Sequence, residues 1–273
     1  MNKAIRYLTF CTFVIVFISC NGSNDNEINN EGAIAAPASL QYEIVKVYPH
    51  DTSAYTQGLE WDGHQLIEST GLEGKSILHI LDSNQKQVGT KIKLSKEDFG
   101  EGTTLFNGKI YQLTWKNHMV FVYNAKTLVK EKELFWPYEG WGLTHNDSSL
   151  IVSTGESNIY IVDPTTFAIQ KTIGVYNNFG YLSNINELEL VNGKLYANIY
   201  GRNSVVVIDL KTGLVTHTID FGNLLSQAGV KYDPLTVDVG YVLNGIAYKP
   251  NTNTFFITGK CWPVMVEMKI KIK

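Results

Sequence analysis

Short runs of alternating apolar and polar residues, separated by Gly, Asn and Asp, dominate the chain from Gln41 onward. Alternation with a period of two predicts β-strands that bury one face, and helical periodicity is scarce. The pattern therefore predicts an all-β fold.

One unit of this pattern, a strand followed by a tight polar turn and a second strand, occurs five times. The units begin at Gly58, Gly102, Gly142, Glu187 and Gly245. Their turns are DG at Asp62, NG at Asn107, ND at Asn146, NG at Asn192 and PNTN at Pro250. Asn-Gly and Asp-Gly favour type I′ hairpins, in which both central residues have positive φ. Further strands follow each hairpin, such as IYIVD from Ile159, which predicts four antiparallel strands per unit.

The spacing of the units predicts the architecture. Their starts are 44, 40, 45 and 58 residues apart, which fits propeller blades and predicts a five-bladed β-propeller. The length of the chain excludes seven blades. The longer fourth interval contains NLLSQAGVKYDPLTVDVG from Asn223, for which we expect a short helix and a loop. The segment QYEIVKVYPHD from Gln41 is expected to add a strand to the last blade and close the ring.

The N-terminal residues have the pattern of an export signal. Lys3 and Arg6 precede an apolar run that ends before Ser19 and Cys20, and this run is too short to favour a spanning helix. We expect a lipoprotein signal over residues 1–19, a lipid on Cys20, a flexible tether over 20–40 and the propeller over 41–273. An ordinary cleaved signal with a chance cysteine is the alternative. The expected location is the periplasmic side of the envelope or the cell surface, with lipid as the only membrane contact.

Charge and motifs exclude several function classes. The net charge of −3 becomes −5 without the signal, and no basic patch with interleaved aromatics suggests nucleic acid. Cys261 is the only cysteine of the expected domain, so no internal disulfide is expected. The histidines form no i, i+4 pair and CxxC, GxSxG and phosphate-loop motifs are absent from the sequence, so a zinc site is not indicated.

The register of the units places polar and aromatic residues around one channel, because the first strand of each blade lines it. The residues before the unit starts are Gln57, Glu101, Trp141, Asn186 and Asn244. The residues where the second strands end are Gly71, Trp115, Gly155, Tyr200 and Lys260. A single carboxylate beside an aromatic wall should have a raised pKa, and an ammonium group can stabilise developing negative charge.

Each of these residues alone has a structural explanation, since Asn and Gln often satisfy strand ends and Trp is usually core. Their common alignment is what indicates a site. The main alternative is a non-catalytic propeller that binds peptides or glycans at the cell surface, and a third is a hydrolase of small amides. The pairing of Glu101 with Lys260 in one channel mouth favours an enzyme. His145 is expected at the surface.

Seven motifs in order resemble those of the plant and bacterial type of glutaminyl-peptide cyclotransferases. They are YTQGLEW from Tyr55, GEGTT from Gly100, YQLTW from Tyr111, EGWGLT from Glu139, INELE from Ile185, LNGIAY from Leu243 and TGKCWP from Thr258. The resemblance covers about residues 42 to 270. It implies a five-bladed propeller and an acyltransferase that converts the N-terminal glutamine of a peptide to pyroglutamate with release of ammonia.

The resemblance also implies roles for the aligned residues. Glu101 would bind the α-amine, take its proton and return one to the leaving ammonia. Gln57 and Asn186 would hold the substrate amide, and Lys260 with Asn186 would lie next to the oxyanion.

The remaining positions would shape the pocket. Trp115 and Trp141 would form its walls, and Phe99 and Tyr55 would extend them, with ordinary blade packing as the alternative for the last two. Tyr200 stands where the family usually has Trp, and Asn244 would contribute to substrate binding. No cofactor is required for this chemistry, a structural calcium ion between Asp-rich loops is left open, and a monomer is expected.

Overall fold

Strands make up most of the computed structural model, which describes residues 33–82, 84–231 and 240–271. The one helix in these ranges is α1 (Leu224–Gln227), which begins at the expected position, so the chain is all-β as predicted. The expected signal at 1–19 and Cys20 lie outside the described residues. In the described part of the chain, no helix is both long and apolar enough to cross a bilayer.

Three of the sheets have four antiparallel strands each, in chain order. The first is β2 (Thr56–Trp61), β3 (Leu66–Thr70), β4 (Ile77–Leu81) and β5 (Gln87–Lys93). The second is β6 (Gly100–Phe106), β7 (Lys109–Thr114), β8 (Met119–Asn124) and β9 (Lys130–Phe135). The third is β10 (Leu143–His145), β11 (Leu150–Ser153), β12 (Asn158–Val162) and β13 (Ile169–Gly174), and a hairpin of β14 (Tyr176–Asn177) and β15 (Gly180–Tyr181) follows.

The last two units are joined into one eight-stranded sheet by the N-terminal strand β1 (Ala38–Pro49). The other strands are β16 (Ile185–Val191), β17 (Lys194–Ile199), β18 (Ser204–Asp209), β19 (Val215–Asp220), β20 (Leu243–Lys249), β21 (Thr254–Gly259) and β22 (Val264–Lys271). From Gln41 onward β1 pairs antiparallel with β22, which is the pairing predicted for this segment. Its first residues, Ala38 to Leu40, pair parallel with β19, so the strand begins before the predicted start at Gln41.

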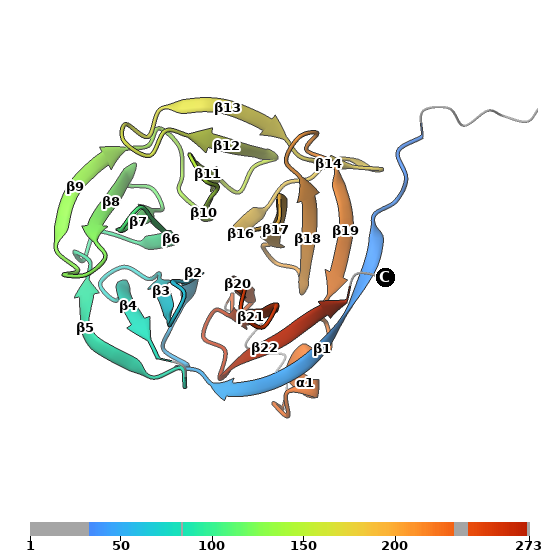
Figure 1. Cartoon of the computed structure of the whole chain (residues 1–273), viewed down its shortest axis with the longest axis horizontal. Coiled ribbons are helices and arrows are strands. Elements are labelled where there is room, and N and C mark those ends of the chain that lie inside the picture. Colours follow the sequence, from blue (N-terminus) through green and yellow to red (C-terminus); the bar gives the residue numbers. More distant parts are fainter. Residues whose placement is uncertain (1–32, 83, 232–239, 272–273) are drawn as a thin grey trace, which may run out of the picture. The chain divides into compact units, whose positions relative to one another are not determined.

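The first strands of the five units are neighbours in space. β2 contacts β6, β6 contacts β10, β10 contacts β16, β16 contacts β20, and β20 contacts β2 again. In Figure 1 these strands lie nearest the centre of the unit, and β5, β9, β13 and β1 lie at its edge. The apolar core fills the space between neighbouring sheets, as where Phe106 of β6 and Trp136 pack with Phe167. This arrangement brings the same end of all five first strands together.

Two of the predicted turns have the expected conformation and two do not. Asn107 and Gly108 have φ values of 50° and 73°, as a type I′ turn requires, and Asn192–Gly193 repeats this geometry. The turns at Asp62 and Asn146 differ, because neither of these residues has a positive φ. Their side chains instead accept backbone N–H groups two and three residues ahead, which is the usual way Asp and Asn close a turn.

The first strands approach one another so closely that glycine is required between them. A Cβ atom added at Gly142 would lie 2.0 Å from the carbonyl oxygen of Asn186, and one at Gly102 would lie 2.6 Å from the backbone nitrogen of Leu143. No side chain fits such a gap. The glycine that opens most of the sequence units therefore sets the distance between neighbouring strands.

Buried carboxylates satisfy backbone groups on the inner edges of these strands. Glu187 accepts the backbone N–H of Ile246 at 2.8 Å and that of Leu59 at 3.3 Å, and Glu189 accepts that of Tyr248 at 2.9 Å. Inner-edge N–H groups have no strand partner and would otherwise be buried without an acceptor. Burial raises the pKa of both carboxyl groups well above the ordinary value.

Glu60 of β2 belongs to the same group of buried carboxyls and predicts a pH dependence of stability. Burial raises its pKa to about 7, although hydrogen bonds from Thr104 and the Leu105 backbone oppose the rise. Its folded pKa is above the unfolded value, so its stabilising effect is complete below about pH 4.5 and is lost as the pH rises through about 7. We expect Glu60→Gln to remove this loss, which amounts to roughly 3 kcal/mol.

Denaturant unfolding of the wild type and Glu60→Gln between about pH 4 and about pH 8, a range that contains both pKa values, measures this effect. Glu97→Gln, which changes an exposed carboxylate, is the control and should keep the wild-type slope. An equal slope in wild type and Glu60→Gln would contradict the prediction.

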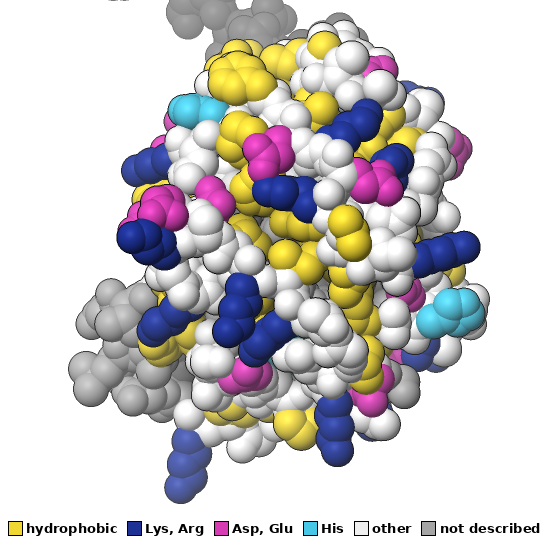
Figure 2. All heavy atoms as spheres, turned by 90° about the vertical axis from the view of Figure 1, so that its left-hand side faces the viewer, with side chains coloured by type: hydrophobic (Ala, Val, Ile, Leu, Met, Phe, Trp, Pro, Cys, Tyr) yellow, Lys and Arg dark blue, Asp and Glu magenta, His cyan; other side chains and the backbone are white. Residues whose placement is uncertain are grey.

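Positive and negative side chains are mixed on the side of the molecule where β9 lies, as Figure 2 shows. Ion pairs between Lys109 and Glu131 and between Lys130 and Glu133 contribute to this mixture. A surface that binds a phosphate backbone would present an excess of basic groups. On the side drawn in Figure 2, the basic groups are interspersed with acidic ones.

Candidate active site

A cavity of about 290 Å³ opens where the equivalent ends of the first strands meet. It is lined by Tyr55, Gln57, Phe99, Glu101, Trp115, Trp141, Asn186, Tyr200 and Lys260. All nine are residues that the sequence placed in the site. Glu101 and Lys260, which come from different units, line the same cavity as the sequence predicted.

Local irregularities in the strands aim these side chains into the cavity. The pairing register shifts around Gln57 in β2, around Glu101 in β6 and around Asn186 in β16. Such β-bulges redirect a side chain and take its residue out of the ladder. Serine hydroxyls of the adjacent sheets replace part of the lost bonding, because Ser69 donates to the carbonyl of Glu101 and Ser153 to that of Asn186.

Gln57 connects the two charged residues of the site. Its Nε2 donates to Glu101 Oε1 at 3.1 Å, and its Oε1 accepts a hydrogen bond from Lys260 Nζ. Asn244 Nδ2 lies 3.4 Å from the same Oε1 atom. The side-chain oxygen of Gln57 therefore already accepts hydrogen bonds from other residues of the protein. This geometry orients Glu101 and Lys260, and it leaves Gln57 less free to hold a substrate amide than the sequence suggested.

Asn244 does not line the cavity, contrary to the sequence alignment of the units. Its side chain is fully buried and donates to the carbonyl of Thr56 at 3.0 Å. Together with the contact to Gln57 Oε1, this bond joins Asn244 to β2. Asn244 therefore supports Gln57 instead of facing the cavity.

The carboxyl group of Glu101 is buried, and this makes it more basic. Only 4% of the residue is exposed. Burial raises the pKa of Glu101 well above its ordinary value, the positive charge of Lys260 opposes this rise, and Glu139 adds to it. A carboxyl group with such a pKa can exchange protons near neutral pH.

Lys260 follows β21 and is buried between two tyrosine rings. Its Nζ lies 4.7 Å from the centre of the Tyr55 ring and 5.4 Å from that of Tyr200, a geometry suited to cation–π attraction. Burial lowers the pKa of Lys260 to about 8, and the charge of Glu101 acts in the opposite direction. The ammonium form therefore prevails at neutral pH.

Asn186 brings an unused acceptor to the cavity. Its Oδ1 is buried and has no hydrogen-bond partner among the described residues. A buried acceptor without a donor costs free energy. An N–H group of a ligand in the cavity would remove this cost.

Aromatic side chains cover the positions where two units have glycine. A Cβ atom at Gly71 would lie 2.3 Å from the Phe99 ring, and one at Gly155 would lie 2.6 Å from the Trp141 ring. Phe99 also packs against Trp115, with ring centres 5.5 Å apart. The two glycines leave room for aromatic residues of neighbouring segments, which then form the apolar wall.

Glu139 is a site residue that sequence reasoning did not identify. Its Oε2 accepts hydrogen bonds from both wall tryptophans, from Trp115 Nε1 at 2.8 Å and from Trp141 Nε1 at 3.1 Å. One carboxylate thus fixes two indole rings, one directly after β7 and the other two residues before β10. Its position in the motif EGWGLT, two residues before Trp141, was the only signal that pointed to it.

His145 is only partly exposed, where the sequence suggested a surface position. Its Nδ1 lies 2.8 Å from Thr104 Oγ1, its ring packs on Phe106, and burial lowers its pKa. In the ranges that the structure describes, no three His, Cys, Asp or Glu side chains are grouped so that they could hold a metal ion.

The chain is similar to known proteins over most of its length. The sequence profile described as glutamine cyclotransferase matches residues 14–270. The chain is 34% identical over 233 residues to the glutaminyl-peptide cyclotransferase of Arabidopsis thaliana, which covers 85% of this chain and 72% of that protein. The crystal structure of Myxococcus xanthus glutaminyl cyclase is similar with a TM-score of 0.77 and 32% identity, over 87% of this chain and 99% of that one. The chain therefore belongs to the glutamine cyclotransferase family.

Proposed function

We propose that this protein converts the N-terminal glutamine of peptides to pyroglutamate and releases ammonia. The observation that supports it best is the enclosure of one buried carboxyl group, one buried ammonium group and an unused amide acceptor in a cavity with aromatic walls. A glutamine side chain with its α-amine needs these partners. Family membership agrees with the same activity.

The proposed reaction is an intramolecular acyl transfer. The α-amine attacks the γ-carbonyl carbon of its own side chain, a C–N bond forms, and the amine proton passes to Glu101. Glu101 returns a proton to the amide nitrogen, the C–NH₂ bond breaks, and ammonia leaves as the lactam closes. Because both reacting groups belong to one molecule, holding the folded conformer lowers the barrier substantially.

The other polar residues stabilise the oxygen that becomes negative. Lys260 has three N–H donors and uses one of them for Gln57. We propose that a second one points to the oxyanion, and that Asn186 holds the substrate through its free Oδ1. Trp115 and Trp141 confine the aliphatic part of the glutamine, and no cofactor takes part.

An end-group comparison tests the function directly. The purified protein should release ammonia from Gln-Ala and leave a lactam, with no release from acetyl-Gln-Ala, whose amine cannot attack. A hydrolase of small amides would instead leave glutamate, and a binding module would leave both peptides unchanged. A chelator should not reduce the rate, and a loss that added metal reverses would contradict the metal-free mechanism.

Glu139→Ala should mainly weaken substrate binding. Both indole N–H groups lose their common acceptor, so the walls become mobile, and we expect KM to rise about tenfold while kcat changes less. Glu139→Gln keeps an acceptor oxygen and should lie close to the wild type. Steady-state kinetics with Gln-Ala measure both constants, and Glu97→Ala is an exposed control. An unchanged KM in Glu139→Ala would refute the proposal that Glu139 holds the two tryptophan walls in place.

We also propose that the described unit is a five-bladed β-propeller closed by β1. The closed series of contacts between β2, β6, β10, β16 and β20 supports it, as does the place of β1 between β19 and β22. Each blade would have four strands, with β1 as the outer strand of the last.

The proposed location is the periplasmic side of the cell envelope or the cell surface, reached as a monomeric lipoprotein anchored through Cys20. The basic start, the short apolar run and the Ser-Cys pair support this proposal. Labelling with a radioactive fatty acid, compared between the wild type and Cys20→Ala, would test it.

A further inference from the structure

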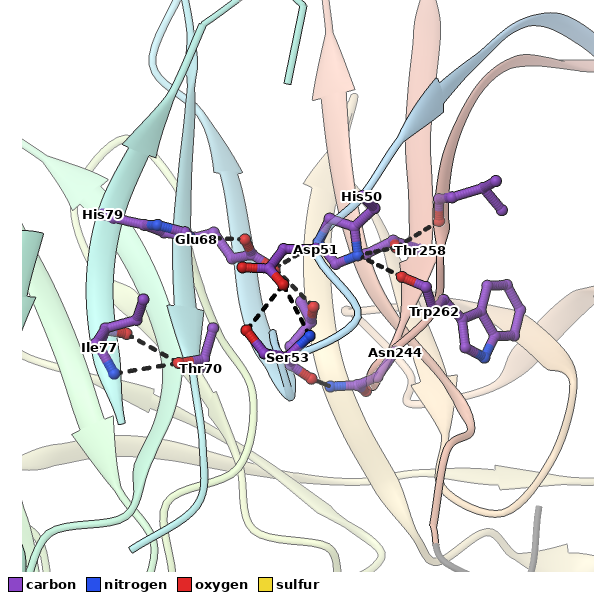
Figure 3. A network of polar contacts seen from close by, with 12 residues as sticks. His50, Asp51, Ser53, Glu68, Thr70, Ile77, His79, Asn244, Thr258 and Trp262 are labelled. Atoms are coloured by element: carbon purple, nitrogen blue, oxygen red, sulfur yellow. Dashed lines mark hydrogen bonds and ion pairs between the residues drawn. The ribbon is translucent and has the colours of Figure 1, made fainter. Parts of the chain in front are cut away.

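A buried carboxylate outside the cavity, that of Glu68 in β3, contacts two imidazole rings and a hydroxyl group. Glu68 Oε1 lies 2.9 Å from His50 Nε2, and Glu68 Oε2 lies 2.8 Å from His79 Nε2. Thr56 Oγ1 donates to Glu68 Oε1 at 2.6 Å. Figure 3 shows Glu68 between the two histidines. The Glu68 and His50 side chains are 1% and 2% exposed, and no step of the proposed reaction uses them.

The geometry requires His50 to carry a proton on both ring nitrogens. Its Nε2 faces the Glu68 carboxylate, and its Nδ1 lies 2.9 Å from the carbonyl oxygen of Trp262. Both partners are acceptors, and a neutral imidazole has only one N–H group. Burial alone would lower the pKa of His50, but the charge and hydrogen bond of Glu68 outweigh it and raise that pKa above the ordinary value.

The charges around His50 come from three segments. Glu68 of β3 is ionised, because the two imidazoles hold its pKa well below the ordinary value against the effect of burial. His79 faces Glu68 from β4, and Asp51 follows His50 in the chain. From β21 and the turn after it, the described partners are neutral, namely the Thr258 hydroxyl at 3.4 Å and the Trp262 carbonyl.

This network connects the two segments that carry Gln57 and Lys260. Thr56, which Glu68 holds, lies between Tyr55 and Gln57, and Trp262, which His50 holds, lies two residues after Lys260. The two segments belong to different sheets, and β2 of the first contacts β20 of the last. The hydrogen bond from Lys260 to Gln57 crosses the same boundary.

We propose that the His50 imidazolium and the Glu68 carboxylate are positioning residues, which hold Gln57 and Lys260 opposite each other across this boundary. The proposal rests on the proposed cyclisation reaction. When His50 loses a proton, it can no longer donate to both acceptors, so the bond to either Glu68 or Trp262 is lost. Gln57 and Lys260 then lose their common support, and Glu101 loses its fixed orientation.

Kinetics of His50→Gln and His79→Gln test the proposal with a matched control. Both change a buried histidine that contacts Glu68, but only His50 is also bonded to the segment of Lys260. We expect His50→Gln to lower kcat about tenfold and to change KM less than about twofold, because the tryptophan walls are untouched. His79→Gln should keep kcat within about twofold of the wild type.

The pH profile separates positioning from a loss of folded protein. In the wild type, kcat should fall as the pH rises through the pKa of His50 and again near the Lys260 pKa of about 8. His50→Gln should retain only the second decrease. A wild-type kcat in folded His50→Gln, or an equal loss in His79→Gln, would overturn the proposal.

A titration followed by NMR tests the same link without turnover, also in case His50→Gln fails to fold. In the wild type, the side-chain amide resonances of Gln57 should shift with the same midpoint as the His50 ring, and Glu68→Gln should lower that midpoint. Gln57 resonances that do not respond to His50 would overturn the proposal. A wild-type protein that shows the coupled titration but no cyclisation would instead refute the proposed function.

Discussion

Glu101→Gln should retain the fold and lower kcat for Gln-Ala by at least about a hundredfold, as expected when general acid–base catalysis is lost. The amide has nearly the shape of the carboxyl group, and its oxygen can still accept the hydrogen bond from Gln57 Nε2. It cannot take the proton of the α-amine. The substitution also removes a buried group whose ionisation is costly, as its raised pKa indicates, so the melting temperature should not fall.

Glu60→Gln is the matched control for this experiment. Glu60 is also a buried carboxyl group on a first strand, but it is not among the residues that line the cavity. The Glu60→Gln variant should therefore keep kcat within about twofold of the wild-type value. Normal turnover by Glu101→Gln would show that another group moves the proton.

Lys260→Met should lower kcat/KM by about a hundredfold, which is the scale for losing one donor to an oxyanion. Methionine has a similar length and no charge, so the effect reports the ammonium group. The loss of Lys260 also removes the charge that holds down the pKa of Glu101. The acidic limb of the pH profile should therefore move to higher pH, and the alkaline limb near the Lys260 pKa of about 8 should disappear.

Lys249→Met is the control for the lysine variant. Lys249 Nζ also lies over aromatic rings, 5.3 Å from the centre of Trp61, but it pairs with Glu267 instead of lining the cavity. Its kcat/KM should stay near the wild-type value. A Lys260→Met enzyme with an unchanged alkaline limb would show that the limb belongs to another group.

The strands and the cavity wall were largely predictable because they depend on local signals. A period of two, turn residues and a repeated unit identify the first strands, and the residue before each glycine then falls at the same strand end. Glu101 and Lys260, far apart in the chain, could be placed together in this way. The alignment failed for Asn244, because a register position does not tell whether a short side chain turns toward the cavity or beneath its neighbour.

Contacts that depend on distant segments were not predictable. Glu139 holds two tryptophans across a sheet boundary, and no spacing in the sequence encodes that convergence. The same is true of the contact between Glu68 and His50, which follows β1, whereas His79 is simply the cross-strand neighbour of Glu68 on β4. His145 is less exposed than expected for a related reason, since Thr104 and Phe106 of the neighbouring strand β6 contact one side of its ring.

The bulges around Gln57, Glu101 and Asn186 separate the chemistry of this protein from its architecture. The residues that face the substrate contribute little to the pairing between strands, whereas the glycines next to them set the spacing of the scaffold. Exchanges at the reactive positions should therefore be tolerated by the fold, while a methyl group at Gly142 should not. Related proteins could therefore acquire new substrate preferences by exchanging the residues that face the substrate, while they keep the glycines that space the strands.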